Sequence, residues 1–325
     1  MKALFFQDNK LQFRSDFPDP VPCENEALIR VIYAGICSTD LELVKGYMNF
    51  DGILGHEFVG IIEKCTDKDL IGKRVSGEIN ISCQKCSYCN SGMERHCPNR
   101  SVLGILGRDG AFAELLTLPT RNLHLIPDSI SDDEALFIEP VAAAFEILEQ
   151  LPVSHGDKVC LIGDGRLGIL TAQVLASTGC QLLVMGKHEE KLAILQSKGI
   201  KTKVISAPCP TLSSELKNSF HIVVDCTGSP EGIESAMKLV RSGGTIVLKT
   251  TVAGERRLDL NELVIDEITL IGSRCGPFEP AIKAIEGKVV NVKQLISKVF
   301  TLDDGINAFD FAAKKGVLKV LLKMS

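Results

Sequence analysis

Four cysteines within fifteen residues constrain this chain more than any other feature of its sequence: Cys83, Cys86, Cys89 and Cys97. Two-residue gaps let a tight turn present two thiolates to one metal ion, and zinc takes four thiolates in a tetrahedral site. A site closed by four sulfurs leaves no coordination position for a substrate. The spacing therefore predicts a structural zinc ion in a lobe over residues 80–100. The alternative, four unrelated free or disulfide-bonded thiols, does not account for the spacing.

The bulk composition is that of an ordinary globular protein with a large core. The 325 residues are enough for two domains. A net charge of −5 argues against a nucleic-acid or anionic-membrane partner. The most apolar stretch, residues 135–151, contains three glutamates and a proline and is too short to span a bilayer. Twelve cysteines without a signal-peptide pattern predict a cytoplasmic protein.

The pattern of apolar residues changes near residue 157. Before it, short apolar runs at 28–33 and 58–63 with nearby turn residues predict a β-rich lobe. After it, strands and helices alternate with short connections, which predicts an α/β domain on a parallel sheet. The predicted strands are 158–162, 181–185, 221–225 and 245–249, and the predicted helices are 167–177, 189–197 and 231–240. An amphipathic segment at 305–315 and a strand at 318–323 follow near the C-terminus.

A glycine-rich turn connects the first strand and helix of the α/β part, and its residues are Gly163, Gly165, Arg166, Leu167 and Gly168. In a dinucleotide site, one such glycine makes the turn, one lets the backbone approach a pyrophosphate, and one packs the helix on the strand. The helix N-terminus offers N–H groups and a positive dipole to the phosphates. The strand–turn–helix context thus favours a dinucleotide site over a turn without a ligand.

The end of the second predicted strand bears on which nicotinamide coenzyme binds. An acidic residue at that point would bind the adenosine ribose hydroxyls. Here the strand ends in Gly186, Lys187 and His188, with no acid before Glu189. The two basic side chains can bind a 2′-phosphate, so the sequence predicts NADP in preference to NAD. The alternative is that both side chains belong to a solvated loop.

Several short motifs occur in a fixed order along the chain. They are 35–40 (GICSTD), 55–57 (GHE), the four-cysteine lobe, 107–114 (GRDGAFAE), 139–140 (EP), the glycine turn and 225–229 (DCTGS). In this order they resemble the zinc-dependent medium-chain alcohol dehydrogenase family, in its polyol, glucose and threonine dehydrogenase branch. The resemblance implies a GroES-like β-rich catalytic domain over 1–140 and 276–325. It also implies a Rossmann domain, a doubly wound parallel sheet, over 141–275.

The resemblance further implies a catalytic zinc ion held by Cys37, His56 and Glu139. Glu57 stands at a position that family members use as an exchangeable ligand or as a group touching the ligands. Asp40 matches a carboxylate that orients His56. A thiolate, an imidazole and a carboxylate leave one zinc position for water or a substrate oxygen. Taken alone, Cys37 would be read as a buried thiol and His56 as a core histidine.

Other matches to the family are less specific. Thr39 matches a hydroxyl that relays the substrate proton, and Glu42 occupies the place where many members carry a histidine of that relay. Lys319 matches a basic residue that reaches the coenzyme pyrophosphate. Thr227 follows a predicted strand at the sheet edge where ligands bind. The alternatives are a surface carboxylate for Glu42 and a surface lysine for Lys319.

The resemblance implies an oxidoreductase that transfers a hydride between a secondary alcohol or polyol and a nicotinamide coenzyme. An aldose dehydrogenase and a simple alcohol or aldehyde reductase are the alternatives within the same chemistry. A catalytically silent NADP-binding protein and a nucleic-acid-binding zinc module are the alternatives outside it. Two zinc ions per chain would indicate the enzyme. The family forms dimers and tetramers, usually through the edge of the Rossmann domain, so a homodimer or homotetramer is expected.

Overall fold

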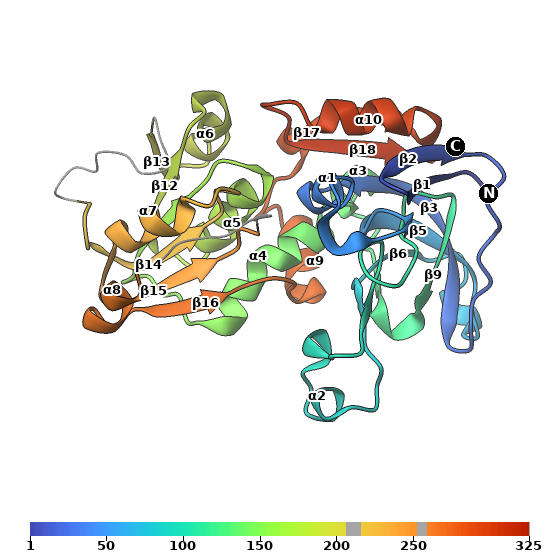
Figure 1. The fold of residues 1–325 in the computed structure, drawn as a ribbon, viewed down its shortest axis with the longest axis horizontal. Helices are drawn as coiled ribbons and strands as arrows, with labels where there is room; N and C mark the ends of the chain where they lie inside the picture. Colours follow the sequence, from blue (N-terminus) through green and yellow to red (C-terminus); the bar gives the residue numbers. More distant parts are fainter. Residues whose placement is uncertain (206–215, 252–258, 325) are drawn as a thin grey trace. The chain divides into compact units, whose positions relative to one another are not determined.

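The computed structural model describes residues 1–205, 216–251 and 259–324. The chain divides into two compact units, which Figure 1 shows in colours that follow the sequence. The first unit holds Met1–Glu139, Ala281–Glu286 and Val292–Ser325, and the second holds Pro140–Pro280 and Gly287–Asn291. The first unit is therefore assembled from segments far apart in the sequence.

The first unit is built mainly on β-sheets. In the described residues its largest sheet has seven strands: β3 (Glu26–Ile36), β5 (Glu57–Lys64), β6 (Arg74–Gly77), β9 (Leu115–Pro119), β10 (Leu123–Leu125), β17 (Ile296–Thr301) and β18 (Lys319–Lys323). The strand order is β10-β6-β5-β3-β18-β17, and β9 also pairs with β3. Strand β3 is therefore the centre of the sheet, with antiparallel partners β5, β9 and β18.

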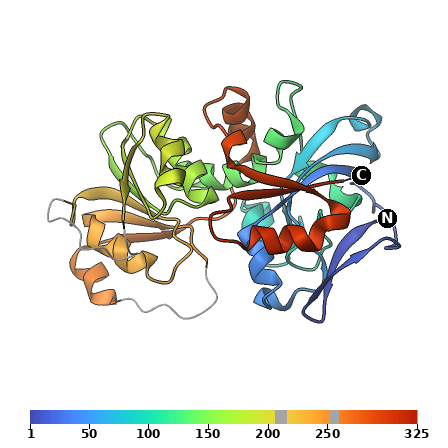
Figure 2. The same cartoon turned by 90° about the horizontal axis from the view of Figure 1, so that it is seen from above.

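Smaller elements surround this sheet. A second sheet contains β2 (Lys10–Arg14), β1 (Ala3–Gln7) and β4 (Gly52–Ile53), and a third contains β7 (Asn80–Ile81) and β8 (Ser101–Val102). The α-helices are α1 (Ser38–Leu43), α2 (Ser87–Asn90), α3 (Asp132–Ala135) and α10 (Gly305–Ala312). The 3₁₀ turns are η1 (Tyr47–Asn49), η2 (Lys68–Leu70), η3 (Glu94–His96), η4 (Thr120–Asn122), η5 (Lys293–Leu295) and η6 (Leu302–Asp304). Figures 1 and 2 show α10 running alongside β18, and both termini lie close together.

The burial of β3 follows from its position in the sheet. Ala27, Ile29 and Val31 are buried and Arg30 between them is exposed, as expected of a strand with one face on the core. At the end of the strand, Ala34–Ile36 are all buried because β5 and β18 pair there on either side. The residue that follows, Cys37, therefore leaves the sheet at its most enclosed point.

The second unit has the alternating architecture that the sequence predicts. In the described residues its sheet has the order β13-β12-β11-β14-β15-β16, and every neighbouring pair is parallel. The strands are β11 (Lys158–Ile162), β12 (Gln181–Gly186), β13 (Lys201–Val204), β14 (Phe220–Asp225), β15 (Val240–Leu248) and β16 (Thr269–Gly272). This order is that of a doubly wound sheet, in which ligands bind outside the carboxyl ends of the strands where the order reverses.

Helices cover this sheet, and they are α4 (Ile138–Gln150), α5 (Arg166–Ala176), α6 (Glu189–Gln196), α7 (Gly232–Leu239) and α8 (Leu260–Ile265). Helix α9 (Phe278–Glu286) spans the division between the two units. Strand β11 is buried from Val159 to Ile162 because helices pack on both faces of a parallel sheet. One cluster of the core includes Cys160, Met185, Val223 and Ile246 from neighbouring strands.

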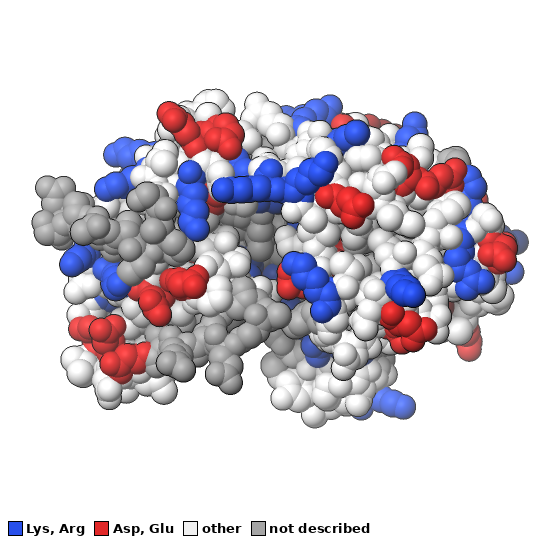
Figure 3. All heavy atoms as spheres, turned by 45° about the horizontal axis from the view of Figure 1, so that its top comes forward, with Lys and Arg blue, Asp and Glu red and all other residues white. Residues whose placement is uncertain are grey.

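The described residues contain no helix long and apolar enough to cross a bilayer. On the face shown in Figure 3, Lys and Arg side chains are interspersed with Asp and Glu side chains.

Candidate active site

Three donor side chains of different chemistry converge in the first unit. The ligand atoms of Cys37, His56 and Glu57 all lie within 4.8 Å of one another. The pairing of β3 with β5 brings them together, because Gly35 stands opposite Glu57 and the chain continues from Gly35 to Cys37. His56 and Glu57 are buried, and Cys37 is partly exposed. The family resemblance implies that Cys37 and His56 meet and that Glu57 is a ligand or stands beside the ligands, and the structure brings these three residues together.

Asp40 fixes two of these residues. Its Oδ2 accepts a hydrogen bond of 2.7 Å from the backbone N–H of Cys37. Cys37 is the N-cap residue of α1, so this bond also fixes the start of that helix. Its Oδ1 lies 3.2 Å from Nδ1 of His56, and the Asp40 side chain is wholly buried. Burial lowers the pKa of His56, but the charges of Asp40 and Cys37 outweigh it and hold the pKa well above its usual value. Asp40 thus has the orienting contact with His56 that the sequence predicts.

Lys319 is part of the same cluster. Strand β18 places it there, because Val320 stands opposite Ile36 at the end of β3. Its side chain is wholly buried and its ammonium group pairs with the Glu57 carboxylate. Burial lowers the pKa of Lys319 to about 8, although Cys37 and Asp40 raise it. Lys319 is therefore not a surface lysine, and its contact with a coenzyme pyrophosphate stays a prediction.

The donor set fits a zinc ion. Zinc binds thiolate sulfur, imidazole nitrogen and carboxylate oxygen at about 2.0–2.3 Å, so ligand atoms of one tetrahedral site lie roughly 3–4 Å apart. The separations of at most 4.8 Å among Cys37, His56 and Glu57 need only small side-chain movements to reach that range. Three protein ligands leave one position for a substrate oxygen or water.

The other residues predicted for this site lie around it at different places. Glu139, predicted as the carboxylate ligand, is in the first turn of α4, partly exposed, and is not one of the three converging residues. Oγ1 of Thr39 lies 3.9 Å from Sγ of Cys37. Glu42 forms an ion pair with Lys45 and its side chain is 35% exposed. Glu42 therefore has the contacts of a surface carboxylate.

The four-cysteine lobe also has the geometry of a metal site. All four sulfurs lie within 4.8 Å of one another, and Sγ of Cys86 is 3.5 Å from Cys89 and 3.7 Å from Cys97. Four Zn–S bonds of about 2.3 Å would separate the sulfurs by about 3.8 Å. The backbone N–H of Lys85 lowers the pKa of Cys83 to about 6, which favours the thiolate that zinc binds. The arrangement fits the closed four-sulfur site that the spacing predicts.

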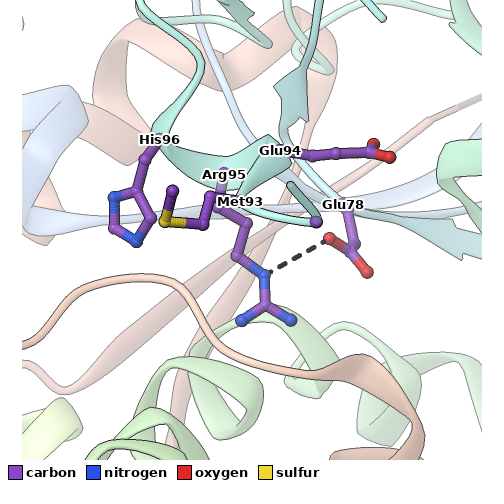
Figure 4. A pocket seen from close by; sticks show the side chains of 6 residues that line it. Glu78, Met93, Glu94, Arg95 and His96 are labelled. Carbon is purple, nitrogen blue, oxygen red and sulfur yellow. Dashed lines mark ion pairs between the residues drawn. The ribbon is translucent and has the colours of Figure 1, made fainter. Parts of the chain in front are cut away.

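A hollow of about 400 Å³ lies beside the cysteine lobe. Figure 4 shows Arg95 turned toward Glu78, with Nε of Arg95 3.7 Å from the carboxylate. The other lining residues are Gly92, Met93, Glu94 and His96. None of the three converging ligands lines it, so this hollow is not the candidate active site.

The glycine turn of the second unit stands at the carboxyl end of β11. Gly163 has φ of +120°, which makes the turn, and a Cβ on Gly168 would lie 2.2 Å from the carbonyl oxygen of Gly163. A Cβ on Gly165 would meet nothing within 4 Å. The two outer glycines are therefore required by the turn and by packing, and the middle one leaves open space where a pyrophosphate can approach. Arg166 and Leu167 begin α5 beside it.

Thr227 holds the neighbouring turn after β14. Its N–H and hydroxyl both donate to Oδ1 of the wholly buried Asp225, at 2.9 and 2.7 Å. Its hydroxyl also accepts a hydrogen bond of 3.1 Å from the N–H of Ser229. Thr227 thus stands at the expected edge of the sheet and shapes the turn there, and its contact with a coenzyme stays a prediction.

An acidic side chain does lie at the end of β12, although the sequence gives none there. Asp164, between the first two glycines of the turn, points its carboxylate at Lys187 and His188. The residues that follow the second strand give no sign of Asp164, because it comes from the loop after the first strand. An aspartate inside the glycine turn is the signal that was available in the sequence.

Comparison with known proteins identifies the fold and the family. Residues 23–128 match the alcohol dehydrogenase GroES-like domain, and residues 167–287 match the zinc-binding dehydrogenase domain. The chain belongs to the zinc-dependent medium-chain alcohol dehydrogenase family. A sorbitol dehydrogenase from Halalkalibacterium halodurans is 29% identical over 323 residues, which cover 94% of this chain and 93% of the relative.

Several solved structures of similar fold contain a bound coenzyme. A zinc-binding dehydrogenase from Sinorhizobium meliloti 1021, bound to NADP, has a TM-score of 0.88 at 24% identity and covers 99% of this chain and 98% of its own. An enzyme from Escherichia coli CFT073, described as a short chain alcohol dehydrogenase with NADH, has a TM-score of 0.91 at 24% identity and covers 99% of both chains. The predicted family and fold class are confirmed, and this medium-chain dehydrogenase is a zinc-dependent alcohol or polyol oxidoreductase.

The cysteine lobe gives the first testable prediction. Cys97→Ser is expected to remove one zinc ion per chain and to lower the thermal midpoint by at least about 5 °C, because metal binding contributes folding free energy. Metal analysis and calorimetry measure the two effects. Cys65→Ser, which changes a thiol outside the lobe, is the control and should leave the zinc content unchanged. An unaltered zinc content in the Cys97 variant would contradict the assignment.

Proposed function

We propose that this dehydrogenase interconverts a secondary alcohol or polyol and its carbonyl compound at a zinc ion held by Cys37, His56 and Glu57. The observation that carries the proposal is the convergence of these three ligand atoms within 4.8 Å. Glu57 takes the place that the family resemblance implies for Glu139, because Glu57 is the carboxylate in the converging group. The relationship to a sorbitol dehydrogenase supports a substrate with vicinal hydroxyl groups.

In the reaction, the alcohol carbon gives a hydride to the nicotinamide ring, and the hydroxyl group gives up a proton. Zinc, when bound, supplies the Lewis acidity that makes loss of the hydroxyl proton easier. Asp40 keeps the His56 ring in place, as its 3.2 Å contact indicates. The ammonium of Lys319 offsets the charge of Glu57 in a buried site. The Thr39 hydroxyl, beside Cys37, is proposed to relay the substrate proton, accepting it while its own proton passes on toward solvent.

Kinetics of ligand variants test this proposal. Wild-type enzyme is expected to oxidise secondary alcohols or polyols with formation of reduced coenzyme, in a panel that also includes aldoses and primary alcohols. Cys37→Ser and His56→Ala should each lower kcat/KM by at least about 100-fold and remove one zinc ion per chain while the lobe zinc remains. An unchanged rate in both variants would end the proposal.

The two candidate carboxylates are separated by matched variants. Glu57→Gln is expected to lower kcat/KM and the catalytic zinc content more than Glu139→Gln, because the amide keeps the shape and removes the charge. A larger effect of Glu139→Gln than of Glu57→Gln would make Glu139 the third protein ligand of the zinc ion.

We propose that NADP is the preferred coenzyme. Lys187 is exposed and His188 is partly exposed at the end of β12, where the adenosine ribose of a dinucleotide is recognised. The carboxylate of Asp164 lies 3.0 Å from Nδ1 of His188, so this basic pair includes a negative partner. Among the similar structures, one carries NADP, one NADH and one NAD, so both coenzymes occur in this fold.

The coenzyme preference is tested by steady-state kinetics. Wild-type kcat/KM is expected to be at least about 10-fold higher with NADP than with NAD, since a charged phosphate contact discriminates by that order. Lys187→Ala should reduce this ratio by raising KM for NADP. A higher kcat/KM with NAD would contradict the proposal.

We propose that the protein forms a homodimer through the edge of the Rossmann sheet. Strand β16 is at that edge, and Leu260, Val264 and Ile265 of the adjoining α8 are 63%, 75% and 78% exposed. The unpaired edge of a strand and the exposed apolar side chains beside it form a surface that a second copy of the chain can cover.

Ile265, the most exposed of these apolar side chains, provides a test of the proposed dimer. Ile265→Asp is expected to convert the dimer to a monomer in sedimentation or light scattering, because it would bury a charge at the interface. Val299→Asp, which changes a 45% exposed side chain in the first unit, is the control and should leave the mass unchanged. A monomeric wild-type protein would refute the proposal.

A further inference from the structure

Asp164 has contacts that neither catalysis nor the glycine turn requires. Its side chain lies directly over the end of β12, where a Cβ on Gly186 would come within 2.5 Å of Asp164 Cβ. Its Oδ2 accepts hydrogen bonds from the backbone N–H of Lys187 at 2.7 Å and of His188 at 2.6 Å. Asp164 is 7% exposed, so these contacts are made in a largely desolvated place. The Asp164 carboxylate thus holds the backbone of the two residues that are expected to contact the adenosine ribose.

The same carboxylate fixes the imidazole of His188. Nδ1 of His188 lies 3.0 Å from Oδ2 and 3.2 Å from Oδ1 of Asp164. An ionised carboxylate only accepts hydrogen bonds, so Nδ1 must carry the proton that is shared with it. Nε2, on the other side of the ring, is then the atom that can meet a ligand, and the His188 side chain is 25% exposed. The orientation of the ring is therefore set by Asp164.

The acidic residue at the end of β12 has contacts that differ from those usual in dinucleotide-binding sheets. In many dinucleotide-binding sheets an acidic residue at the end of the second strand binds the ribose hydroxyls directly. Here an acid occupies the same end of the strand, but its oxygens are already engaged by two backbone N–H groups and an imidazole. Such a carboxylate acts on the ligand through the residues it holds.

We propose that Asp164 is a positioning residue for coenzyme discrimination and acts through His188, whose Nε2 distinguishes a 2′-phosphate from a 2′-hydroxyl group. The inference rests on the proposed preference for NADP. It assigns to the aspartate inside the glycine turn a role in specificity and none in hydride transfer. Removal of the Asp164 carboxylate should therefore raise KM for NADP and leave kcat nearly unchanged.

A double-mutant cycle tests the coupling. The quantity measured is the ratio of kcat/KM with NADP to kcat/KM with NAD, in wild type, Asp164→Ala, His188→Ala and the double variant. Each single variant is expected to lower the ratio by about 5–10-fold through KM for NADP, with kcat changed by less than about 2-fold. The double variant should match His188→Ala within about 2-fold, because residues that act through one contact are not additive.

A conservative variant and a matched control complete the experiment. Asp164→Asn keeps an oxygen that can accept from the two backbone N–H groups, so it should recover most of the ratio lost in Asp164→Ala. Asp157 has the same kind of contacts, with the N–H of Ser154 at 2.7 Å and Nδ1 of His221 at 3.2 Å, but it precedes β11 at the opposite end of the sheet. Asp157→Ala should leave the ratio unchanged.

The other outcomes overturn the inference. An equal loss of kcat/KM with both coenzymes in Asp164→Ala and Asp164→Asn would mean a purely structural role. A full loss in the His188→Ala background would mean that Asp164 acts by a route other than His188, either through Lys187 or by touching the ribose itself. If Asp164→Ala does not fold, Asp164→Ser, which also removes the carboxylate, takes its place in the cycle. A wild-type ratio below one would refute the NADP preference alone, because the coupling can still be measured.

Discussion

The antiparallel pairing of β3 with β5 is the interaction on which the candidate active site depends. Its register places Gly35 opposite Glu57, so the thiol of Cys37 and the imidazole of His56 emerge at the same place. A shift of one residue would turn each side chain to the other face of the sheet. Strand β18 pairs with the other edge of β3 and adds Lys319. Three segments distant in the sequence therefore meet because one strand pairs with two others.

The charges in this cluster compensate one another. Asp40, Glu57 and Lys319 are wholly buried, and burying a charged group costs several kcal/mol unless it has a partner. Glu57 has the ammonium of Lys319, and Asp40 has the backbone N–H of Cys37 and the imidazole of His56. A divalent cation between Cys37, His56 and Glu57 would add a positive charge to a site already rich in acceptors. The buried polar cluster is therefore consistent with a metal site and is difficult to explain as an apolar core.

In the second unit the parallel sheet has the same organising role. Because all its strands in the described residues run in one direction, the turns after β11, β12 and β14 lie at one edge. Gly163, Asp164, His188 and Thr227 all belong to these turns. The Asp164 carboxylate in the first turn accepts hydrogen bonds from the backbone N–H groups of Lys187 and His188 in the second. The phosphate-binding loop and the ribose-recognising loop are therefore not independent. A change of coenzyme specificity at Lys187 or His188 would have to take Asp164 into account.

The sequence by itself determined the features that depend on local spacing. The four-cysteine lobe, the glycine turn and the alternating strands and helices were all predicted, because each is specified by residues within a few positions of one another. The motif order was also enough for the family. The tertiary structure decided which distant side chains meet: Glu57 lies with Cys37 and His56, Lys319 is buried against Glu57, and Asp164 reaches the end of β12. These contacts depend on strand pairing and on the stacking of turns along a sheet edge, which spacing in the sequence does not encode.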